Sequence, residues 1–184
     1  MQRFILSTFL ILFSTLANAQ SLTAQLSGDS ARFAYTSDVL GEALGRLELN
    51  AGILYNDNDD YAVSVGLQVR GENLDAPLLV SLGARAYYGN IGVYTATAVA
   101  LGGDVVFAPI SIPGFEIGAH FYIAPEPVSF SDAISLRDYG VRVGYQVIPL
   151  STVYVGYQKF EIEIENVGDV LLDDGIVFGL QIQF

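Results

Sequence analysis

Apolar and polar residues alternate along most of the chain beyond residue 20, and this two-residue period constrains the fold more than any other feature. Successive side chains of a β-strand point to opposite faces, so the period predicts strands with one apolar and one polar face. Val63 and Val65, for example, alternate with Ser64 and Gly66. Little of this part of the chain has a helical period of 3.6 residues. The sequence therefore predicts an all-β fold.

Ten strands are expected between segments rich in Gly, Pro, Asn and Asp. All six Pro residues fall between these strands, where a missing N–H donor removes no ladder hydrogen bond. Most of the strands are long enough to cross a bilayer at a tilt, which takes about 9 to 11 residues. An eight-stranded barrel is the alternative if the N-terminal segment stays outside the closed sheet. The expected strands are 21–27, 30–37, 44–56, 61–72, 78–88, 97–108, 114–124, 136–148, 152–165 and 173–184.

The composition favours a membrane barrel over a soluble sandwich. The chain is 52% hydrophobic and contains a single Lys, whereas a soluble surface needs many charged residues. No run of 18 apolar residues is present, so a spanning helix is excluded and an antiparallel up-and-down transmembrane β-barrel is expected. A secreted or periplasmic β-sandwich is the alternative. Aromatic residues near strand ends fit the girdles of such barrels; they are Tyr55, Tyr61, Tyr88, Phe107, Phe121 and Tyr139.

An even number of strands brings both termini to one side of the membrane, which for exported barrels is the periplasm. The outer connections are then expected at 57–60, 89–96, 125–135 and 166–172. The periplasmic connections are expected at 38–43, 73–77, 109–113 and 149–151.

Residues 1–19 have the features of a cleaved secretory signal peptide. A short basic start at Arg3 precedes an apolar stretch, and Ala17-Asn18-Ala19 fits a small-x-small cleavage site. We expect cleavage after Ala19, leaving residues 20–184 as a single barrel domain that fractionates with the outer membrane. Recovery of the mature chain in the soluble periplasm would contradict this prediction.

Several classes of function are disfavoured by charge and composition. The net charge of −12 disfavours nucleic acid, whose phosphates require Lys and Arg. The absence of Cys excludes disulfides, thiolate metal sites and thiol nucleophiles. No cofactor or metal site is expected, and the acidic segments around Asp57 and Asp169 do not match a calcium-binding loop. We interpret them as solvated hairpins that contact lipopolysaccharide through divalent ions.

Charged residues that the alternation turns inward are the candidate site. A barrel of eight to ten strands is largely filled by side chains, so inward charges must pair or cost several kcal/mol each. We expect a structural ion-pair network, with a narrow diffusion pore or a ligand niche as the alternative. The predicted lumen residues are Glu48, Arg70, Arg85, Asp104, Glu116, His120, Asp138 and Arg142.

The only His is a candidate catalytic base for a lipid-modifying enzyme of the outer membrane. Catalysis by His120 requires a positioned nucleophile, and no Ser lies two or four residues away on its strand. A Ser from another strand stays open as an alternative. The sequence therefore favours a non-enzymatic barrel.

Residues 152–165 depart from simple alternation. Val153 and Val155 hold one phase of apolar residues, whereas Phe160 and Ile162 hold the other. A phase change requires one extra residue, so a β-bulge is predicted near 158–159. The distal half of this segment, with residues 166–172, is expected to project above the membrane as an acidic hairpin and to contact a partner.

The last strand has the apolar, aromatic-ended pattern that the barrel assembly machinery is thought to read in outer-membrane clients. We expect it to act as an assembly signal for a monomeric barrel that is surrounded by outer-membrane lipid. The residues of this signal are Phe178, Leu180, Ile182 and Phe184.

Several segments resemble the YfaZ-type outer-membrane proteins of Gram-negative bacteria. They are the signal peptide ending in Ala19, the Asn/Asp-rich residues 56–60, the aromatic pair before Ala-Pro in 121–125, the turn and strand at 149–157, and the terminal Phe184. The resemblance covers most of the mature chain and implies a small outer-membrane barrel without an assigned reaction. These motifs concern barrel architecture, so the resemblance indicates location better than activity.

Overall fold

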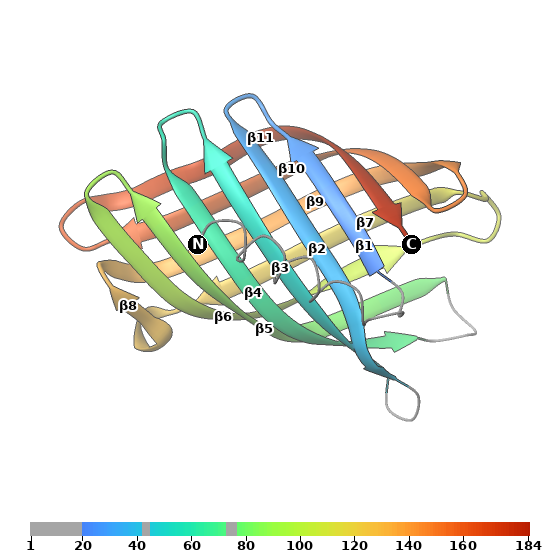
Figure 1. The fold of residues 1–184 in the computed structure, drawn as a ribbon, viewed down its shortest axis with the longest axis horizontal. Helices are drawn as coiled ribbons and strands as arrows, with labels where there is room; N and C mark the ends of the chain where they lie inside the picture. Colours follow the sequence, from blue (N-terminus) through green and yellow to red (C-terminus); the bar gives the residue numbers. More distant parts are fainter. Residues whose placement is uncertain (1–19, 42–44, 73–76) are drawn as a thin grey trace, which may run out of the picture.

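The computed structural model describes residues 20–41, 45–72 and 77–184, which form a closed antiparallel β-barrel (Figure 1). Strands neighbouring in sequence pair around most of the ring, and β1 (Gln20–Leu26) pairs with β11 (Gly168–Gln183) to complete it. The other ring strands are β2 (Ser30–Gly41), β3 (Arg46–Asn56), β4 (Tyr61–Glu72), β5 (Leu78–Ile91), β6 (Tyr94–Phe107), β7 (Phe115–Ala124), β9 (Ala133–Ile148) and β10 (Ser151–Ile164). The predicted ten-stranded ring is confirmed, and the eight-stranded alternative is wrong.

A short extra strand, β8 (Ser129–Ser131), follows the 3-10 helix η1 (Glu126–Val128) and pairs with β6. It lies at the end of the barrel opposite the C-terminus (Figure 1). In residues 20–41, 45–72 and 77–184, no helix is long and apolar enough to cross a membrane.

Both ends of the described chain meet at one end of the barrel. The amide of Gln20 donates to the carbonyl of Phe184 at 3.0 Å, and the amide of Phe184 donates back at 2.9 Å. We call this the termini end, and the end that carries β8 and the turn between β10 and β11 the far end. The predicted signal peptide at 1–19 and parts of the predicted connections 38–43 and 73–77 lie outside the described residues.

The outer face follows the predicted phase. On β4, Val65 is 51% exposed, whereas its neighbour Gly66 is buried. The aromatic pairs Tyr61–Tyr88 and Phe121–Tyr139 have ring centroids 6.5 and 6.4 Å apart. All six Pro residues lie outside the strands, as predicted. An apolar outer face with aromatic residues around the barrel suits contact with lipid.

Three predicted outer connections were too long. Residues 89–96 were interpreted as a loop because of their Gly and Asn residues, but Gly89 and Asn90 stay in the ladder of β5 and β6. The actual turn is the pair Gly92–Val93, where Gly92 takes the positive φ of 57° that a tight hairpin requires. Similarly, the predicted connection 166–172 is mostly strand because β11 begins at Gly168, and 125–135 contains η1, β8 and the start of β9.

The predicted bulge on β10 at 158–159 is wrong. Thr152, Tyr154, Gln158, Phe160 and Ile162 are buried at a spacing of two or four residues, so the strand keeps one inward phase. Glu161 has the opposite phase and is also buried, because Arg137 and Lys159 pair with it and cover it. Instead, the apolar and polar residues of β10 change places between its outer and inner faces partway along the strand. Toward the far end the interior becomes apolar and the outer face carries charges, whereas the prediction attributed the change of phase to an extra residue on this strand.

The extra residue lies on the neighbouring strand. The register between β10 and β11 shifts after Phe160, which pairs with Asp173, whereas Glu161 pairs with Leu171. Leu172 is left without a partner across this pairing, and both Leu172 and Asp173 are buried. Two consecutive inward side chains are the signature of a β-bulge.

Candidate functional site: the barrel lumen

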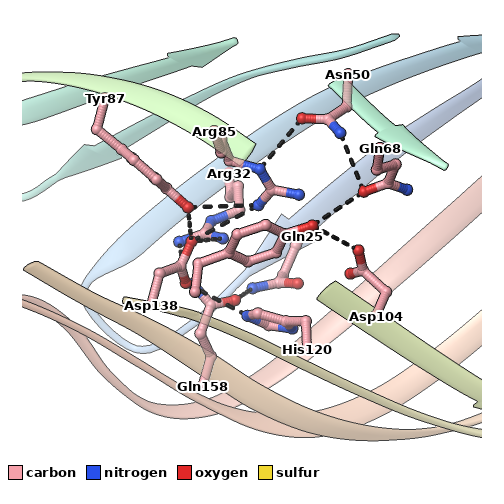
Figure 2. Close-up of polar contacts among 11 residues, drawn as sticks. Gln25, Arg32, Asn50, Gln68, Arg85, Tyr87, Asp104, His120, Asp138 and Gln158 are labelled. Carbon is pink, nitrogen blue, oxygen red and sulfur yellow. Dashed lines mark hydrogen bonds and ion pairs between the residues drawn. The ribbon is translucent and has the colours of Figure 1, made fainter. Parts of the chain in front are cut away.

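Asp138 on β9 is the centre of a buried polar network inside the barrel (Figure 2). Its carboxylate has no exposed surface and accepts two hydrogen bonds from Arg32, each at 3.2 Å. The Tyr87 hydroxyl donates to it at 2.9 Å, His120 Nε2 lies 3.3 Å away, and Arg85 Nη1 lies 3.9 Å away. A fully buried carboxylate is tolerated only with this degree of pairing.

A second group of polar residues continues the network across β3, β4, β6 and β7. Glu48 accepts a hydrogen bond from Gln68 at 2.7 Å and pairs with Arg70 at 2.9 Å. The Tyr122 hydroxyl lies 2.9 Å from the Gln68 side-chain oxygen and 2.8 Å from Asp104 Oδ2, and it can donate to only one of them at a time. These contacts connect strands on different sides of the lumen.

A third group lies nearer the termini end. Arg142 Nη2 is 3.5 Å from Glu116 and 3.3 Å from the Gln181 side-chain oxygen, to which it donates. The Arg142 guanidinium also lies over the ring of Tyr154, 5.0 Å from its centroid. The Tyr154 hydroxyl in turn donates to Gln25 at 3.0 Å. Arg142 is thus fixed by charge and by ring stacking.

Glycines on neighbouring strands make room for these long side chains. Gly118 is directly opposite Arg142 in the ladder, and a Cβ there would lie 2.9 Å from Arg142 Nε. Gly140 is opposite His120, and a Cβ there would lie 2.8 Å from the imidazole. The inward Gly residues therefore let polar side chains lie flat against the wall of the barrel.

Above the network, the far end of the lumen is filled by buried apolar side chains. These residues, which we call the apolar plug, come from strands around most of the ring. Phe160 packs against Tyr87 with ring centroids 5.5 Å apart, and Ile162 is 0% exposed. The apolar plug comprises Leu54, Ala62, Tyr87, Ile91, Ala96, Ala98, Ala100, Tyr122, Ala124, Ala133, Leu136, Phe160, Ile162, Ile164 and Leu172.

A cavity of about 570 Å³ occupies the lumen below the apolar plug. Its wall includes Gln183 and Arg46 toward the termini end, and Tyr87 and Phe160 toward the far end. Ile162 and Ile164 do not line it, so the cavity stops at the inner layer of the plug. The expectation of a lumen filled by ion pairs throughout is therefore corrected. The ion pairs occupy its middle, and an open volume remains.

The structure places all eight sequence-predicted lumen residues on the inside of the barrel. It brings together Glu48 with Arg70, Glu116 with Arg142, and Arg85 and His120 with Asp138. Asp104 contacts Tyr122 and has no ion pair within the described part of the chain. The sequence reasoning missed Arg32, the main partner of Asp138. Its inward phase between Ala31 and Phe33 was the available signal.

Among the described residues, no hydroxyl nucleophile lies within hydrogen-bond distance of His120. Its Nε2 faces Asp138, and no Ser or Thr hydroxyl of the described residues hydrogen-bonds to its ring. Within the same residues, no group of three or more acidic or His side chains is arranged to hold a metal ion. At the far end Asp60 instead accepts a hydrogen bond from the Gly92 amide at 2.8 Å, and Asp132 accepts one from the Thr95 amide at 2.9 Å. Both carboxylates thus stabilise the turn between β5 and β6.

A closed ring of ten antiparallel strands, with an apolar outer face and a polar lumen, is the architecture of outer-membrane β-barrels. The predicted family resemblance is confirmed. The chain belongs to the YfaZ precursor family, whose model matches residues 1–184. No curated protein matches the chain significantly.

Three solved structures are similar in overall shape at low sequence identity. A chain from a study of the in-meso crystallisation of membrane proteins has a TM-score of 0.48 and 11% identity, covering 91% of this chain and 83% of that one. The outer membrane channel DcaP of Acinetobacter baumannii has a TM-score of 0.45 and 12% identity, covering 88% of this chain and 54% of that one. The NanC porin has a TM-score of 0.42 and 10% identity, covering 91% of this chain and 98% of that one.

Proposed function

We propose that this protein is a small, non-conducting barrel of the outer membrane with a structural or binding role. The observation that carries the proposal is the apolar plug, whose buried side chains fill the lumen at the far end. A dry apolar constriction opposes ions because it offers nothing to replace their hydration shell. The cavity below it is then a vestibule with one entrance, at the termini end.

We place the termini end in the periplasm. The polarity of β10 supports this orientation, because its outer face near the far end carries the ion pairs of Glu161 with Arg137 at 2.9 Å and with Lys159 at 2.7 Å. Charged pairs on the outer face suit water or headgroups outside the membrane core. The vestibule would then receive solutes from the periplasm.

Planar-bilayer recording tests the blocked lumen. We expect no sustained single-channel conductance from the wild type. A variant with Phe160→Ala and Ile162→Ala removes the centre of the apolar plug and should show openings. The matched control, Phe121→Ala with Ile176→Ala, removes the same side-chain types from the outer face, where they are 52% and 62% exposed, and should stay silent. Stable, ion-selective openings from the wild type would make the protein a narrow diffusion channel.

The channel is the second candidate because the cavity leaves part of the lumen open. A lipid-modifying enzyme is the third, and the inward, Asp138-bound position of His120 supports a non-enzymatic role instead. Mass spectrometry of lipid A after overexpression of the protein tests the enzyme. A change in lipid A mass that His120→Gln abolishes would establish enzymatic activity.

We further propose that the barrel is monomeric, sits among outer-membrane lipid and lipopolysaccharide, and is assembled through its last strand. The outward position of Phe178, Leu180, Ile182 and Phe184 supports recognition of that strand during assembly. Heat modifiability of the outer-membrane fraction in SDS gels tests the placement, because a folded barrel migrates differently before and after boiling.

A further inference from the structure

The vestibule has balanced charge although the chain as a whole is strongly acidic. Five Arg and five Asp or Glu residues line the cavity, whereas the whole chain carries a net charge of −12. A lining of this kind produces little net attraction for an anion or a cation. It does present separate positive and negative groups to a solute that carries both.

Asp104 is the one acidic residue of the described cavity lining that has no ion pair within 4 Å. Glu48, Glu116 and Asp138 each lie within 4 Å of an Arg, and Asp38 is 3.5 Å from Arg46. Asp104 is half-buried, and its Oδ2 lies 2.8 Å from the Tyr122 hydroxyl, whose single proton it shares with the Gln68 side-chain oxygen. Asp104 lines the cavity, and no Arg, Lys or His side chain of the described residues lies within 4 Å of its carboxylate. Arg85, whose guanidinium lies over the Tyr122 ring 3.9 Å from the centroid, interacts with Asp104 only from beyond that distance.

Arg70 lies at the same height, two strands away. Arg70 pairs in register with Ser81 on β5, and Ser81 pairs in register with Asp104 on β6. Neighbouring strands are about 4.8 Å apart, so the two backbones are roughly 10 Å apart. Arg70 uses Nη1 for Glu48 at 2.9 Å and Nε for Ser81 at 3.5 Å, and these contacts leave Nη2 for another acceptor.

We propose that the row Arg70–Ser81–Asp104 binds a small solute that bears one ammonium group and one carboxylate, the chemistry of an amino acid or a short peptide. Asp104 accepts the ammonium group, and the Arg70 guanidinium donates to the carboxylate. This site specifies a ligand class for the proposed binding role, and it rests on the proposal that solutes enter the vestibule from the termini end. Paired recognition of both charges also explains why the lumen keeps a carboxylate without an ion pair.

Calorimetric titration of the folded barrel in detergent at low salt tests the site with three probes: glycylglycine, putrescine and succinate. We expect glycylglycine to bind one to one, and the dication and the dianion to bind at least tenfold more weakly. Asp104→Asn keeps the acceptor for Tyr122 but removes the charge, and it should weaken glycylglycine about tenfold, equal to about 1.4 kcal/mol. The matched control is Asp169→Asn, the same change on the exposed far end, and it should leave binding unaltered.

Three results would overturn the proposal: no binding of glycylglycine, equal or tighter binding of putrescine or succinate, or unchanged affinity in Asp104→Asn. If Asp104→Asn loses heat modifiability, Arg70→Lys replaces it, because Lys keeps the charge beside Glu48 but lacks the planar donor fork. That variant should also weaken glycylglycine, and unchanged affinity would overturn the site. A wild type that conducts in bilayers and still binds glycylglycine would refute the blocked lumen while supporting the binding site.

Discussion

Removal of the Asp138 carboxylate is the sharpest test of the lumen network. Asp138→Ala leaves Arg32, with 17% of its side chain exposed, and Arg85, with 14% exposed, without their shared counter-ion. It also removes the acceptor for the Tyr87 hydroxyl. Breaking a buried pair by deleting one partner costs about 3 to 5 kcal/mol, because the remaining charge is uncompensated. We expect Asp138→Ala to lower the free energy of unfolding by about that amount.

The control is Glu116→Ala, which removes the same kind of group from the same lumen. Glu116 is 3.5 Å from Arg142, and both side chains are partly open to the cavity. Water can replace the lost contact there, so the expected cost is about 1 kcal/mol or less. The comparison separates burial from charge because both variants remove one carboxylate.

Urea-induced unfolding from phospholipid vesicles measures both costs. The chain has 11 Tyr and no Trp, so Tyr fluorescence and heat modifiability report the folded barrel. The double variant Arg32→Met with Asp138→Leu should recover much of the loss, since apolar replacements remove both buried charges together. If Asp138→Ala costs no more than Glu116→Ala, the network is hydrated and the argument from burial is wrong.

Three further changes test the outer face, the wall and the last strand. Val65→Arg should cost about 2 to 4 kcal/mol in lipid, whereas Ser64→Arg should show crowding without that lipid penalty; reversed results in vesicle unfolding would overturn the phase. Gly102→Ala should cost about 1 to 3 kcal/mol in the same assay, because a Cβ there overlaps the Phe121 carbonyl, whereas Gly175→Ala should be nearly neutral because nothing lies within 4 Å. Deletion of Phe184 should reduce the heat-modifiable fraction in cells, and unchanged assembly would contradict the predicted signal.

The fold was largely predictable because alternation and Pro placement are local signals. Each strand needs only its own sequence to show which residues face outward, and the even number of strands followed from the parity argument. The strand ends were less predictable. Gly89 and Asn90 have turn-forming side chains, yet the ladder continues through them because the tighter turn at Gly92 satisfies more backbone hydrogen bonds.

The site was predictable as a set but not as pairs. Alternation placed the eight lumen residues inside, whereas partners such as Arg32 and Asp138 lie 106 positions apart in the sequence. Their meeting depends on the curvature of the ring, which no local pattern encodes. The apolar plug was missed for a different reason. The sequence shows that the apolar residues Phe160 and Ile162 have the opposite phase to Val155. It does not show whether a bulge causes this change or whether the apolar residues move from the outer face to the interior.

The exchange of polarity along β10 has a consequence for how deep the protein sits in the membrane. A shift of the barrel in one direction would submerge Lys159 and Glu161 in hydrocarbon, and a shift in the other would lift Val153 and Val155 into water. Both displacements raise the free energy of the protein in the bilayer, so this strand fixes the depth of insertion. Because all ten strands are hydrogen-bonded into one ring, a single strand sets the immersion of the whole molecule.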